Sequence, residues 1–500
     1  MPEPMPAALI FARPEDEFAP CADYVMRLFA CTEGLTIRAM DSRVSFNKLP
    51  QADPPCVVVL YDAAMNSYDA PLSAISALDM LIVIERGNYF GTAFMKSPSP
   101  PEPHKTMMDA SERGAFQAMI RRDGPNVCRM DFDLIASAFW FLARCEEYVS
   151  TQRDEHDRFQ CAFSAAQPQA YDQPLVNRWF INFMALIEES GRVCGPAPLR
   201  PNREKIRVAL THDVDLLRKY RGFAGARRAV TTIRSAGGLA KAARVSLRAG
   251  VALTTGRGDP YDSFNDLFFL KENLRAKSVF FFMGGGATKY DGKYDIAGRG
   301  AQALIRRALG QGDEIGAHPS YDSYRSERMI CDEAGKIGGA AGAAIRVSRQ
   351  HYLRFAVPET WRALAGCGLR CDCSMAFADR AGFRCGWSGC FRPFDVSRRE
   401  EIPIIEIPMV AMDVSLAVYE KLPAEQVHER LSRLLDASRA PGGAFVLLWH
   451  NIMADRLAHP GYWDALANFF ESEHENMEFV AISELCDEFE RREKQSCLLK

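Results

Sequence analysis

After residue 205 the chain alternates short apolar segments with amphipathic ones, and this alternation restricts the fold more than any other feature. Helical windows such as YDSFNDLFFLKENLRAK lie between apolar segments that are too short to be helices of their own. Such alternation favours parallel strands joined by crossover helices, either in a barrel or in an open sheet. The seven predicted strands are IRVALTHDVD, AKSVFFFMGGG, DEIGAHPS, AIRVSRQHY, LRCDCSMAF, IIEIPMVAMD and AFVLLWHN.

Five of these seven segments run directly into His, Asp or Arg, at the point where catalytic residues collect in parallel α/β folds. Asp213 and Asp215 are two residues apart in THDVD, so an extended chain points both carboxylates to one side. Two neighbouring carboxylates repel each other unless a cation or separate catalytic roles accommodate them. Carboxylate and imidazole ligands together suit zinc, iron, manganese or cobalt better than calcium. Four histidines also end predicted strands: His212, His318, His351 and His450.

Five short motifs follow one another in this region: THDVD, HPSYD, RQHY, CDCSMAFAD and LWH. Their order, spacing and placement at strand ends resemble the polysaccharide deacetylase superfamily, the carbohydrate esterases built on the NodB-homology domain. The resemblance covers roughly residues 206–485. It implies a distorted (β/α) barrel that holds one divalent metal ion, with zinc as the first expectation and iron, cobalt or manganese as alternatives.

The first two motifs imply the catalytic base and the metal ligands. By the resemblance, Asp213 is the base and Asp215 a ligand, and HPSYD supplies His318 as the second ligand. Asp322 stands where the family has a second histidine, and its spacing of four residues from His318 would put both on one helical face. Asp322 is therefore the expected third ligand. His351, which replaces a proline in the third motif, is the alternative.

The remaining motifs imply the residues around the metal. In RQHY, Arg349 would keep the base ionised and oriented, and the backbone N–H of Tyr352 would hold the oxyanion. LWH ends in His450, the expected acid for the departing amine. In CDCSMAFAD, Asp372 or Asp379 is the expected partner of that histidine, and we choose Asp372.

The segment GFRCGWSGCFRPFD places aromatic side chains among arginines. Aromatic faces pack well on pyranose rings, so Trp387 is expected to contact substrate in a glycan-binding groove. A buried anchor for this loop is an equally well supported interpretation. The spacing of the aromatic residues in this segment does not distinguish a substrate contact from a loop anchor.

The segment CGPAPLRPNREK, residues 194–205, has three prolines and a glycine followed by charges, a composition typical of an exposed connector. It divides the chain into an N-terminal domain, residues 1–195, and a barrel domain, residues 206–500. In the first part, CVVVLYD and MLIVIE predict buried strands and FDLIASAFWFLARCEEY predicts a helix. A smaller α/β domain of unknown role is expected there, with His156 on its surface.

Residues 221–258 contain eight Lys or Arg and no acidic residue, and they do not fit the strand–helix alternation. The segment predicts one or two basic helices inserted after the first strand. Two interpretations are open. One is a solvated helical face, and the other is a surface for anionic lipid or polyanionic sugar, which would give a peripheral membrane contact.

Composition excludes several classes of protein. A net charge of −3 gives no overall attraction to nucleic acid, and 48% hydrophobic with 25% charged residues is typical of a globular protein. No apolar stretch reaches the ~18 residues of a membrane span, and the N-terminal sequence does not resemble a signal peptide. We therefore expect a cytoplasmic protein whose 15 cysteines are reduced.

Together these features predict a hydrolase that acts on a carbon–nitrogen bond. The expected reaction is metal-dependent de-N-acetylation of an N-acetylated sugar or glycan precursor inside the cell, in surface polysaccharide synthesis. One alternative keeps the fold and the metal but hydrolyses a small non-sugar amide, which a closed small pocket would favour. The other is a catalytically inactive glycan-binding protein, because Asp322 departs from the family pattern.

Overall fold

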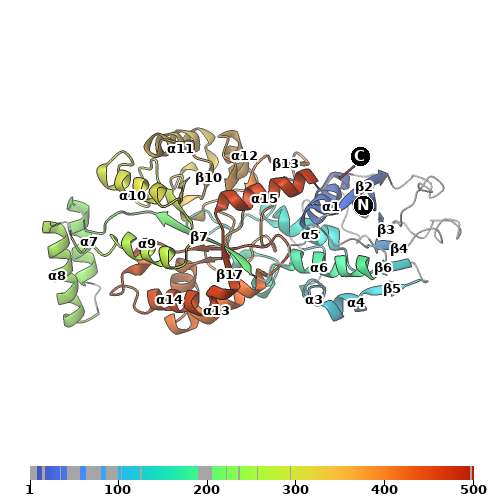
Figure 1. The fold of residues 1–500 in the computed structure, drawn as a ribbon, viewed down its shortest axis with the longest axis horizontal. Helices are drawn as coiled ribbons and strands as arrows, with labels where there is room; N and C mark the ends of the chain where they lie inside the picture. The colour runs from blue at the N-terminus through green and yellow to red at the C-terminus, as the bar shows by residue number, and fades with distance from the viewer. Residues whose placement is uncertain are drawn as a thin grey trace, which may run out of the picture.

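A computed structural model of the protein has two large β-sheets, which follow one another along the long axis of the molecule (Figure 1). One sheet is formed mainly by the first 130 residues, and the other begins at Ile206. A short ribbon of β12 (Phe394–Asp395) and β13 (Glu400–Glu401) accompanies them. The residues described are 8–13, 17–33, 35–41, 57–62, 80–85, 100–102, 104–123, 127–189, 205–220, 222–234, 237–255, 257–292, 294–495 and 498–499.

The sheet that begins at Ile206, called the barrel sheet below, is parallel at every pairing. β17 (Met477–Phe479) pairs with the first residues of its central strand. The other strands, in spatial order, are β14 (Ile405–Glu406), β11 (Cys371–Asp372), β10 (Val347–Ser348), β9 (Glu314–Ala317), β8 (Ser278–Phe282), β7 (Ile206–Val214), β16 (Phe445–Leu448) and β15 (Ala411–Met412).

The barrel sheet curls so far that its two end strands are consecutive in the sequence. β14 ends at Glu406 and β15 begins at Ala411, and the chain between them spans at most about 18 Å. In a flat sheet, eight strands about 4.8 Å apart would place the end strands roughly 34 Å apart. The sheet is therefore a curled, incomplete barrel, and the predicted α/β fold is confirmed.

Helices pack against the barrel sheet through regularly spaced apolar side chains. In α10 the buried residues Ala301, Leu304, Ile305 and Ala308 follow the i, i+3, i+4, i+7 spacing of one helical face. β7 and β8 are buried along their whole length, as strands covered on both faces must be. The helices are α9 (Phe264–Asn273), α10 (Arg299–Gly310), α11 (Glu327–Ala341), α12 (Glu359–Gly366), α13 (Ala424–Ala437), α14 (Tyr462–Glu473) and α15 (Ile482–Gln495).

The N-terminal sheet is parallel apart from the pairing of its last two strands. Its strands, in spatial order, are β18 (Leu498–Leu499), β2 (Thr36–Asp41), β1 (Ala8–Arg13), β3 (Val57–Asp62), β4 (Met80–Glu85), β6 (Val127–Met130) and β5 (Ile120–Arg122). Its helices are α1 (Ala19–Glu33), α3 (His104–Asp109), α4 (Arg113–Ala118), α5 (Leu134–Leu142) and α6 (Leu175–Glu188). Because β18 comes from the other end of the chain, the last residues return to the first sheet.

One apolar core joins the two sheets. It runs without a break from Phe141 and Phe180 to Trp387, in the loop that precedes β12. The buried guanidinium of Arg384 forms a bidentate ion pair with Glu147 across this junction, at 2.7 and 2.8 Å. An ion pair in this position is costly to break, because either charge would be left alone in an apolar core.

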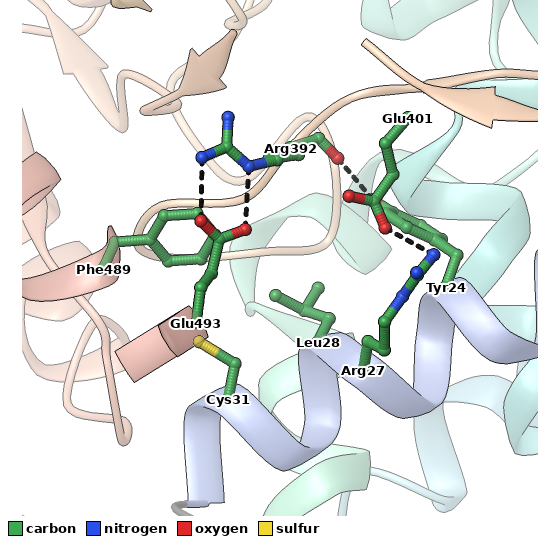
Figure 2. Close-up of a pocket in the computed structure, with 8 residues that line it drawn as sticks. All are labelled: Tyr24, Arg27, Leu28, Cys31, Arg392, Glu401, Phe489 and Glu493. Atoms are coloured by element: carbon green, nitrogen blue, oxygen red, sulfur yellow. Dashed lines mark hydrogen bonds and ion pairs between the residues drawn. The ribbon is translucent and has the colours of Figure 1, made fainter. Parts of the chain in front are cut away.

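A cavity of about 100 Å³ lies between α1 and α15, at the edge of the same junction (Figure 2). Its charged lining residues pair with one another. Arg392 holds Glu493 at 2.8 Å, and Arg27 holds Glu401 at 2.7 Å. The cavity therefore offers no unpaired charge to a ligand among the residues that line it in the described part of the chain.

The basic segment forms a hairpin of two helices, α7 (Gly222–Arg234) and α8 (Leu239–Thr255). Figure 1 shows this hairpin at the opposite end of the molecule from the N-terminal sheet. The helices pack through a small cluster of Tyr220, Ala229, Ala249 and Ala252. None of the helices in the described residues is both long enough and apolar enough to cross a membrane.

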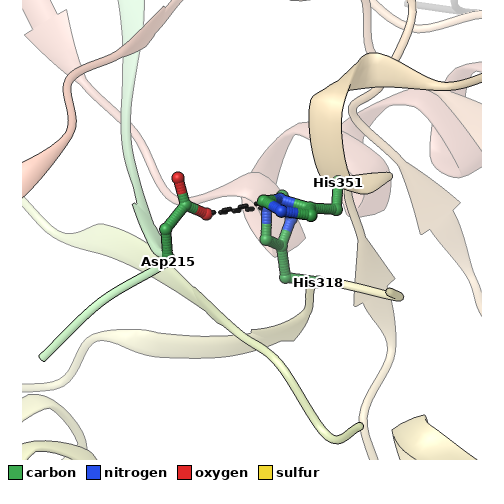
Figure 3. A group of neighbouring side chains, drawn as sticks. All are labelled: Asp215, His318 and His351. Carbon is green, nitrogen blue, oxygen red and sulfur yellow. Dashed lines mark hydrogen bonds and ion pairs between the residues drawn. The ribbon is translucent and has the colours of Figure 1, made fainter. Parts of the chain in front are cut away.

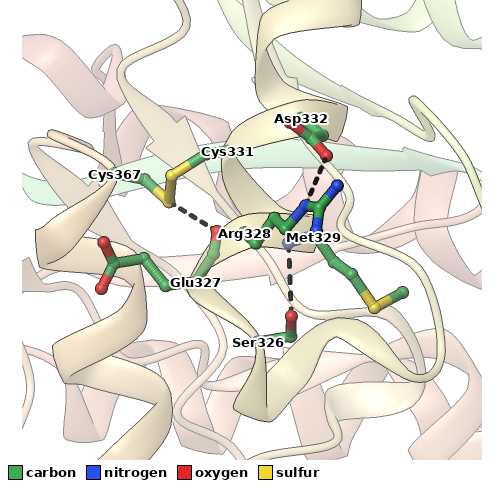
Figure 4. Close-up of a disulfide and its surroundings, with 7 residues drawn as sticks. All are labelled: Ser326, Glu327, Arg328, Met329, Cys331, Asp332 and Cys367. Carbon is green, nitrogen blue, oxygen red and sulfur yellow. Dashed lines mark hydrogen bonds and ion pairs between the residues drawn. A yellow bond between two sulfur atoms is a disulfide. The ribbon is translucent and has the colours of Figure 1, made fainter.

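Cys331 of α11 and Cys367, directly after α12, form a disulfide with their Cα atoms 5.2 Å apart (Figure 4). The expectation that every cysteine is a reduced thiol is wrong at this pair. The barrel topology brings the two helices together, so that cysteines 36 residues apart in sequence reach bonding distance. Ten other cysteines of the described residues are free and buried.

Candidate metal centre

Three strand ends of the barrel sheet bring Asp215, His318 and His351 together (Figure 3). Asp215 directly follows β7, His318 directly follows β9, and His351 follows β10 by three residues. Nε2 of His318 lies 3.2 Å from Oδ1 of Asp215 and 2.9 Å from Nδ1 of His351. Nδ1 of His351 lies 3.4 Å from the same carboxylate oxygen. The three atoms thus form a compact triangle at the carboxyl edge of the sheet.

Backbone carbonyls hold both imidazoles in defined tautomers. Nδ1 of His318 lies 2.7 Å from the carbonyl oxygen of Arg349, and Nε2 of His351 lies 3.0 Å from that of Tyr290. A carbonyl only accepts hydrogen bonds, so each of these nitrogens carries the proton and donates it. The other nitrogen of each ring then turns a lone pair toward the triangle. This outer hydrogen bond is typical of histidines that bind metals.

The triangle has the donor set of a divalent metal site. Two lone pairs and a carboxylate oxygen face one another, and Oδ1 of Asp215 is buried with no hydrogen-bond partner among the described residues. Burial would raise the pKa of Asp215, but protons on the neighbouring imidazoles outweigh it and hold that pKa well below its ordinary range, and a bound cation would take over that role. Ligands about 2.0–2.1 Å from a tetrahedral ion lie about 3.3 Å apart, as these atoms do. The set fits zinc, and also iron, cobalt or manganese.

Asp322 does not join this triangle. Its carboxylate lies 3.1 Å from Nη1 of Arg354, and its side chain is 62% exposed. The helical spacing assumed for Asp322 and His318 is absent, because residues 318–320 are not helical and a turn begins at Tyr321. The structure therefore does not place Asp322 with Asp215 and His318, and His351, the alternative, lies beside them instead.

Asp213 faces the triangle from the same strand as Asp215 and is held by Arg349. Nη1 of Arg349 lies 3.1 Å from Oδ1 of Asp213, and Oδ2 of Asp213 lies 3.8 Å from Nε2 of His318. Arg349 is fully buried and also donates to Oγ1 of Thr211 at 2.8 Å. The carboxylate is therefore next to the ligand atoms but paired with a guanidinium, as a base beside a metal requires.

His450 lies on the other side of the two aspartates and pairs with Asp413. Its Nδ1 is 2.7 Å from Oδ1 of Asp413, whose Oδ2 accepts the backbone N–H of His450 at 2.6 Å. Its Nε2 points at the site, 3.9 Å from Oδ2 of Asp213 and 3.8 Å from Oδ2 of Asp215. Burial would lower the pKa of His450, but Asp413 and then the other carboxylates outweigh it and raise that pKa to about 10. His450 is therefore an imidazolium at neutral pH.

Neither aspartate of CDCSMAFAD is the partner of His450. Asp372, on β11, accepts hydrogen bonds from Oγ of Ser348 at 2.6 Å and from the N–H of Ser374 at 2.9 Å, and burial raises its pKa. Asp379 accepts the N–H of Cys161 at 2.9 Å, from the N-terminal part of the chain. The choice of Asp372 is corrected to Asp413.

Asp413 was missed, although the sequence carries a signal for it. It directly follows β15 and ends the predicted strand IIEIPMVAMD, so the strand-end rule that singled out His318 applies to it equally. β15 pairs with β16, the strand that leads to His450. Neighbouring parallel strands end side by side, and this pairing delivers the carboxylate to the imidazole.

His212 stays outside the site. Its Nδ1 lies 2.8 Å from the carbonyl oxygen of Trp449, and its ring packs on Phe280 with centroids 4.9 Å apart. Burial lowers the pKa of His212 to about 4, so the ring is neutral. It is a core residue at the end of a strand, and it does not contribute to the ligand triangle.

A segment of the N-terminal part reaches the rim of the site. Nδ1 of His156 lies 2.9 Å from the hydroxyl of Tyr321, and its ring contacts that of Tyr352 with centroids 4.8 Å apart. Nη1 of Arg158 donates to the carbonyl oxygen of Tyr352 at 3.1 Å. The side chain of His156 is only 12% exposed, so its predicted surface position is wrong.

Tyr352 adopts the left-handed conformation, with φ of 61°, directly after His351. A residue with a Cβ takes this conformation only where its surroundings impose it. The hydrogen bond from Arg158 is part of that restraint. Nε of Arg158 in turn donates to Oδ2 of Asp154 at 2.8 Å, so the guanidinium is itself held in place.

Trp387 lies far from any open surface. Its side chain is 1% exposed, its ring packs edge-on against Phe180 of α6, and its Nε1 donates to the carbonyl oxygen of Cys390 at 3.3 Å. It cannot contact a sugar from this position. Of the two interpretations open for Trp387, the buried anchor describes the structure, and the substrate contact does not hold.

Comparison with known proteins gives a family only for the N-terminal part. The family of unknown function DUF7033 matches residues 82–192, and no curated protein matches the chain.

Several solved structures are similar to part of the chain at low identity. A protein from Mycobacterium smegmatis assigned to the polysaccharide deacetylases is 16% identical over 60% of this chain and 94% of its own, with a TM-score of 0.38. A polysaccharide deacetylase from Bacillus cereus is 14% identical over 55% and 91%, with a TM-score of 0.28. A CE4 family pseudoenzyme from Bacillus anthracis is 11% identical over 58% and 67%, with a TM-score of 0.30. Similarity at this level carries no conclusion about activity, which must be argued from the site.

Proposed function

We propose that the protein is a metal-dependent hydrolase that removes the acetyl group from an N-acetylated sugar or glycan precursor. One observation carries the proposal. A three-ligand metal set lies between a carboxylate held by an arginine and an imidazolium held by a carboxylate. Metal-assisted amide hydrolysis uses these three parts: a Lewis acid, a base for water and an acid for the amine.

Asp215, His318 and His351 would hold the ion, and the geometry of their donor atoms supports this assignment. When bound, a divalent ion would polarise the acetamide carbonyl and lower the pKa of a water molecule. The outer hydrogen bonds of the two histidines would keep their rings oriented whether or not the ion is present.

Asp213 would take the proton from the attacking water. Its ion pair with Arg349 fixes the direction of the accepting oxygen. His450 would then give its proton to the departing amine, which is a poor leaving group when unprotonated. Asp413 would maintain the imidazolium form before that step and the ring orientation after it.

The backbone N–H of Tyr352 would donate to the oxyanion that forms on the acetyl carbon. The left-handed φ of Tyr352 and its position next to His351 support this role. Arg158 would act as a positioning residue, since it holds the carbonyl of the following peptide. The N-terminal part of the chain would in this way contribute to the geometry of the barrel site.

The proposal also includes the pathway, the cellular location and a membrane contact. The substrate would be a precursor in surface polysaccharide synthesis, the reaction would take place in the cytoplasm, and residues 221–258 would make a peripheral membrane contact. Cell fractionation tests the location, and the panel of substrates described next tests the acceptor.

Metal analysis of the purified protein, together with acetate release from a panel of N-acetylated sugars, tests the proposal. We expect one divalent ion per chain and release of acetate from at least one glycan. Asp213→Asn should keep the ion and lose turnover by about 10²–10⁴-fold, because it removes the base and not a ligand. An ion-free protein without turnover that still binds glycans would instead identify a catalytically inactive binding protein. Release from small non-sugar amides alone would identify the other alternative.

A further inference from the structure

The α7–α8 hairpin exposes apolar side chains that a folded domain ordinarily buries. Ten large hydrophobic side chains are exposed in the described residues, and six of them belong to this hairpin. A concentration of this kind on one element indicates a surface that meets a partner. The six are Phe223, Val230, Leu239, Leu247, Val251 and Leu253.

In α8, two of the four exposed apolar residues form a stripe on the side that faces away from α7. Val245, Ala249 and Ala252 are buried and face α7. Leu247 and Val251 are four residues apart and stand on the opposite side, 73% and 42% exposed. The helix therefore has one apolar side that packs on its partner helix and a second one that is open.

Cations accompany the open stripe. Lys241 and Arg244 are exposed one turn apart, on a face of the helix that lies next to Leu247 and Val251. In α7, Phe223, Arg227, Val230 and Arg234 are exposed at spacings of four, three and four residues, so apolar and cationic side chains alternate along one face.

The charge of the hairpin contrasts with that of the chain. Residues 221–258 hold eight Lys or Arg and no acidic residue, whereas the whole chain has 61 basic and 64 acidic residues. A polyanionic sugar or nucleic acid would use the cations but leave the apolar stripe exposed to water. Apolar side chains flanked by cations are the composition of helices that lie in the interface of an anionic bilayer.

The hairpin is fastened to the loop that carries His450. Lys219, just before α7, and Arg248 of α8 both pair with Asp455, at 3.4 and 2.9 Å. Asp455 directly follows the turn Asn451–Ala454, which begins next to His450. α7 itself starts seven residues after Asp215, from the strand that carries both catalytic aspartates. The hairpin is therefore anchored at the edge of the barrel sheet where the metal cluster lies. A surface that binds the hairpin would lie near that edge.

We propose that the α7–α8 hairpin docks the protein on an anionic lipid bilayer and turns the carboxyl edge of the barrel toward the membrane surface. The proposal rests on the proposed function in one respect: it makes the N-acetylated sugar the head group of a membrane-anchored lipid. The exposed stripe enters the interface, and the flanking arginines and lysines meet the lipid phosphates.

Flotation of the full-length protein with vesicles tests the docking. We expect it to float with phosphatidylcholine vesicles that contain about one third phosphatidylglycerol, and not with pure phosphatidylcholine. The double variant Leu247→Ser/Val251→Ser should lose roughly tenfold in bound fraction at limiting lipid, since it removes the apolar part of the interaction. Phe269→Ser is the matched control, because Phe269 is 66% exposed on α9, away from the hairpin.

Arg227→Glu/Arg244→Glu should also abolish flotation, and Arg306→Glu on α10 should not. All these positions are exposed, so thermal unfolding is expected to stay unchanged and serves as the folding check. Equal binding to neutral and anionic vesicles, no binding to either, or wild-type binding of the Leu247/Val251 variant would each overturn the proposal. Binding of the hairpin to a soluble polyanion with no vesicle binding would replace the bilayer by that partner.

The result of the vesicle-binding experiment does not depend on whether the protein is a deacetylase. Acetate release from a soluble N-acetylated oligosaccharide should be the same in the hairpin variants and the wild type, because the substituted residues are exposed and the metal cluster is formed by residues outside the hairpin. Vesicle binding without acetate release on any substrate would overturn the deacetylase and leave the docking intact. Acetate release without vesicle binding would overturn the docking and leave the deacetylase proposal intact.

Discussion

The strand ends of the barrel bury their charged side chains in pairs, whereas the α7–α8 hairpin exposes its charged side chains to solvent. At the strand ends Asp213 and Arg349 are buried as an ion pair, and so are His450 and Asp413. On the hairpin, Arg244 and its neighbours are exposed beside apolar side chains. Neither arrangement is what stability alone would select, since buried ion pairs seldom repay their desolvation and exposed apolar stripes gain nothing in water. This contrast is the basis for proposing a bound ligand at each region.

The two regions also differ in how strongly salt screens their charges. Charges in the barrel site are screened little, so their geometry and mutual pKa effects persist under most conditions. Charges on the hairpin act over about one Debye length, and salt weakens them. Experiments that remove one contribution at a time should separate the two regions cleanly.

The largest expected effect concerns the third ligand. His351→Ala should lose most of the bound metal and nearly all acetate release, because it removes one of three ligand atoms. Asp322→Ala is the matched control and should keep both, since its carboxylate pairs with Arg354 at the surface. The metal content of the two variants, measured by mass spectrometry, decides whether His351 or Asp322 is the third ligand. Metal lost in Asp322→Ala and kept in His351→Ala would restore the assignment made from sequence spacing.

The next effect concerns the acid. His450→Ala should keep the metal but lose about 10²–10⁴-fold in turnover of an acetamide, since an amine must be protonated to leave. An activated acetate ester of the same acyl group has a good leaving group, so its hydrolysis should fall much less. Turnover of both substrates by the same variant is the measurement. Equal losses on the two would show that His450 is not the leaving-group acid.

Strand ends account for the part of the site that the sequence could predict. The structure brings Asp213, Asp215, His318, Arg349 and His450 to one edge of the barrel sheet. Each of them follows a short apolar segment, and the end of such a segment is a local property that sequence patterns carry. The parallel fold was predictable for the same reason, from alternation alone.

Most of the errors concern which segments become neighbours, and one concerns local conformation. Asp413 reaches His450 because β15 pairs with β16, and no local pattern specifies that pairing. Asp322 was placed by a helical spacing in a stretch that is not helical. His156 and Trp387 were judged from the polarity of their own segments, whereas their burial comes from packing between the two sheets. Contacts between distant segments decide these positions.

A smaller effect tests the partner of His450. Asp413→Asn removes the carboxylate that favours the imidazolium, so the pKa of His450 should fall from about 10 toward or below its usual value. The alkaline limb of the pH profile for acetamide turnover should then move to lower pH, with activity lost as the ring deprotonates. Asp372→Asn is the control, and its alkaline limb should stay in place. A shift in Asp372→Asn without one in Asp413→Asn would reverse the assignment.

The smallest effect on catalysis is expected from salt, and it separates the two regions in one preparation. Raising the salt from ~0.1 M to ~1 M shortens the Debye length from about 10 Å to about 3 Å, which should release the protein from anionic vesicles. Acetate release from a soluble oligosaccharide should change by less than about twofold, because the ion pairs of the site are buried. Both quantities are measured on the same samples, with Arg306→Glu as the control for general charge. If turnover of the soluble substrate fell together with vesicle binding, the site and the hairpin would share one electrostatic surface. If vesicle binding survived high salt, the apolar stripe of Leu247 and Val251 would dominate the docking, and the cations would serve only to orient it.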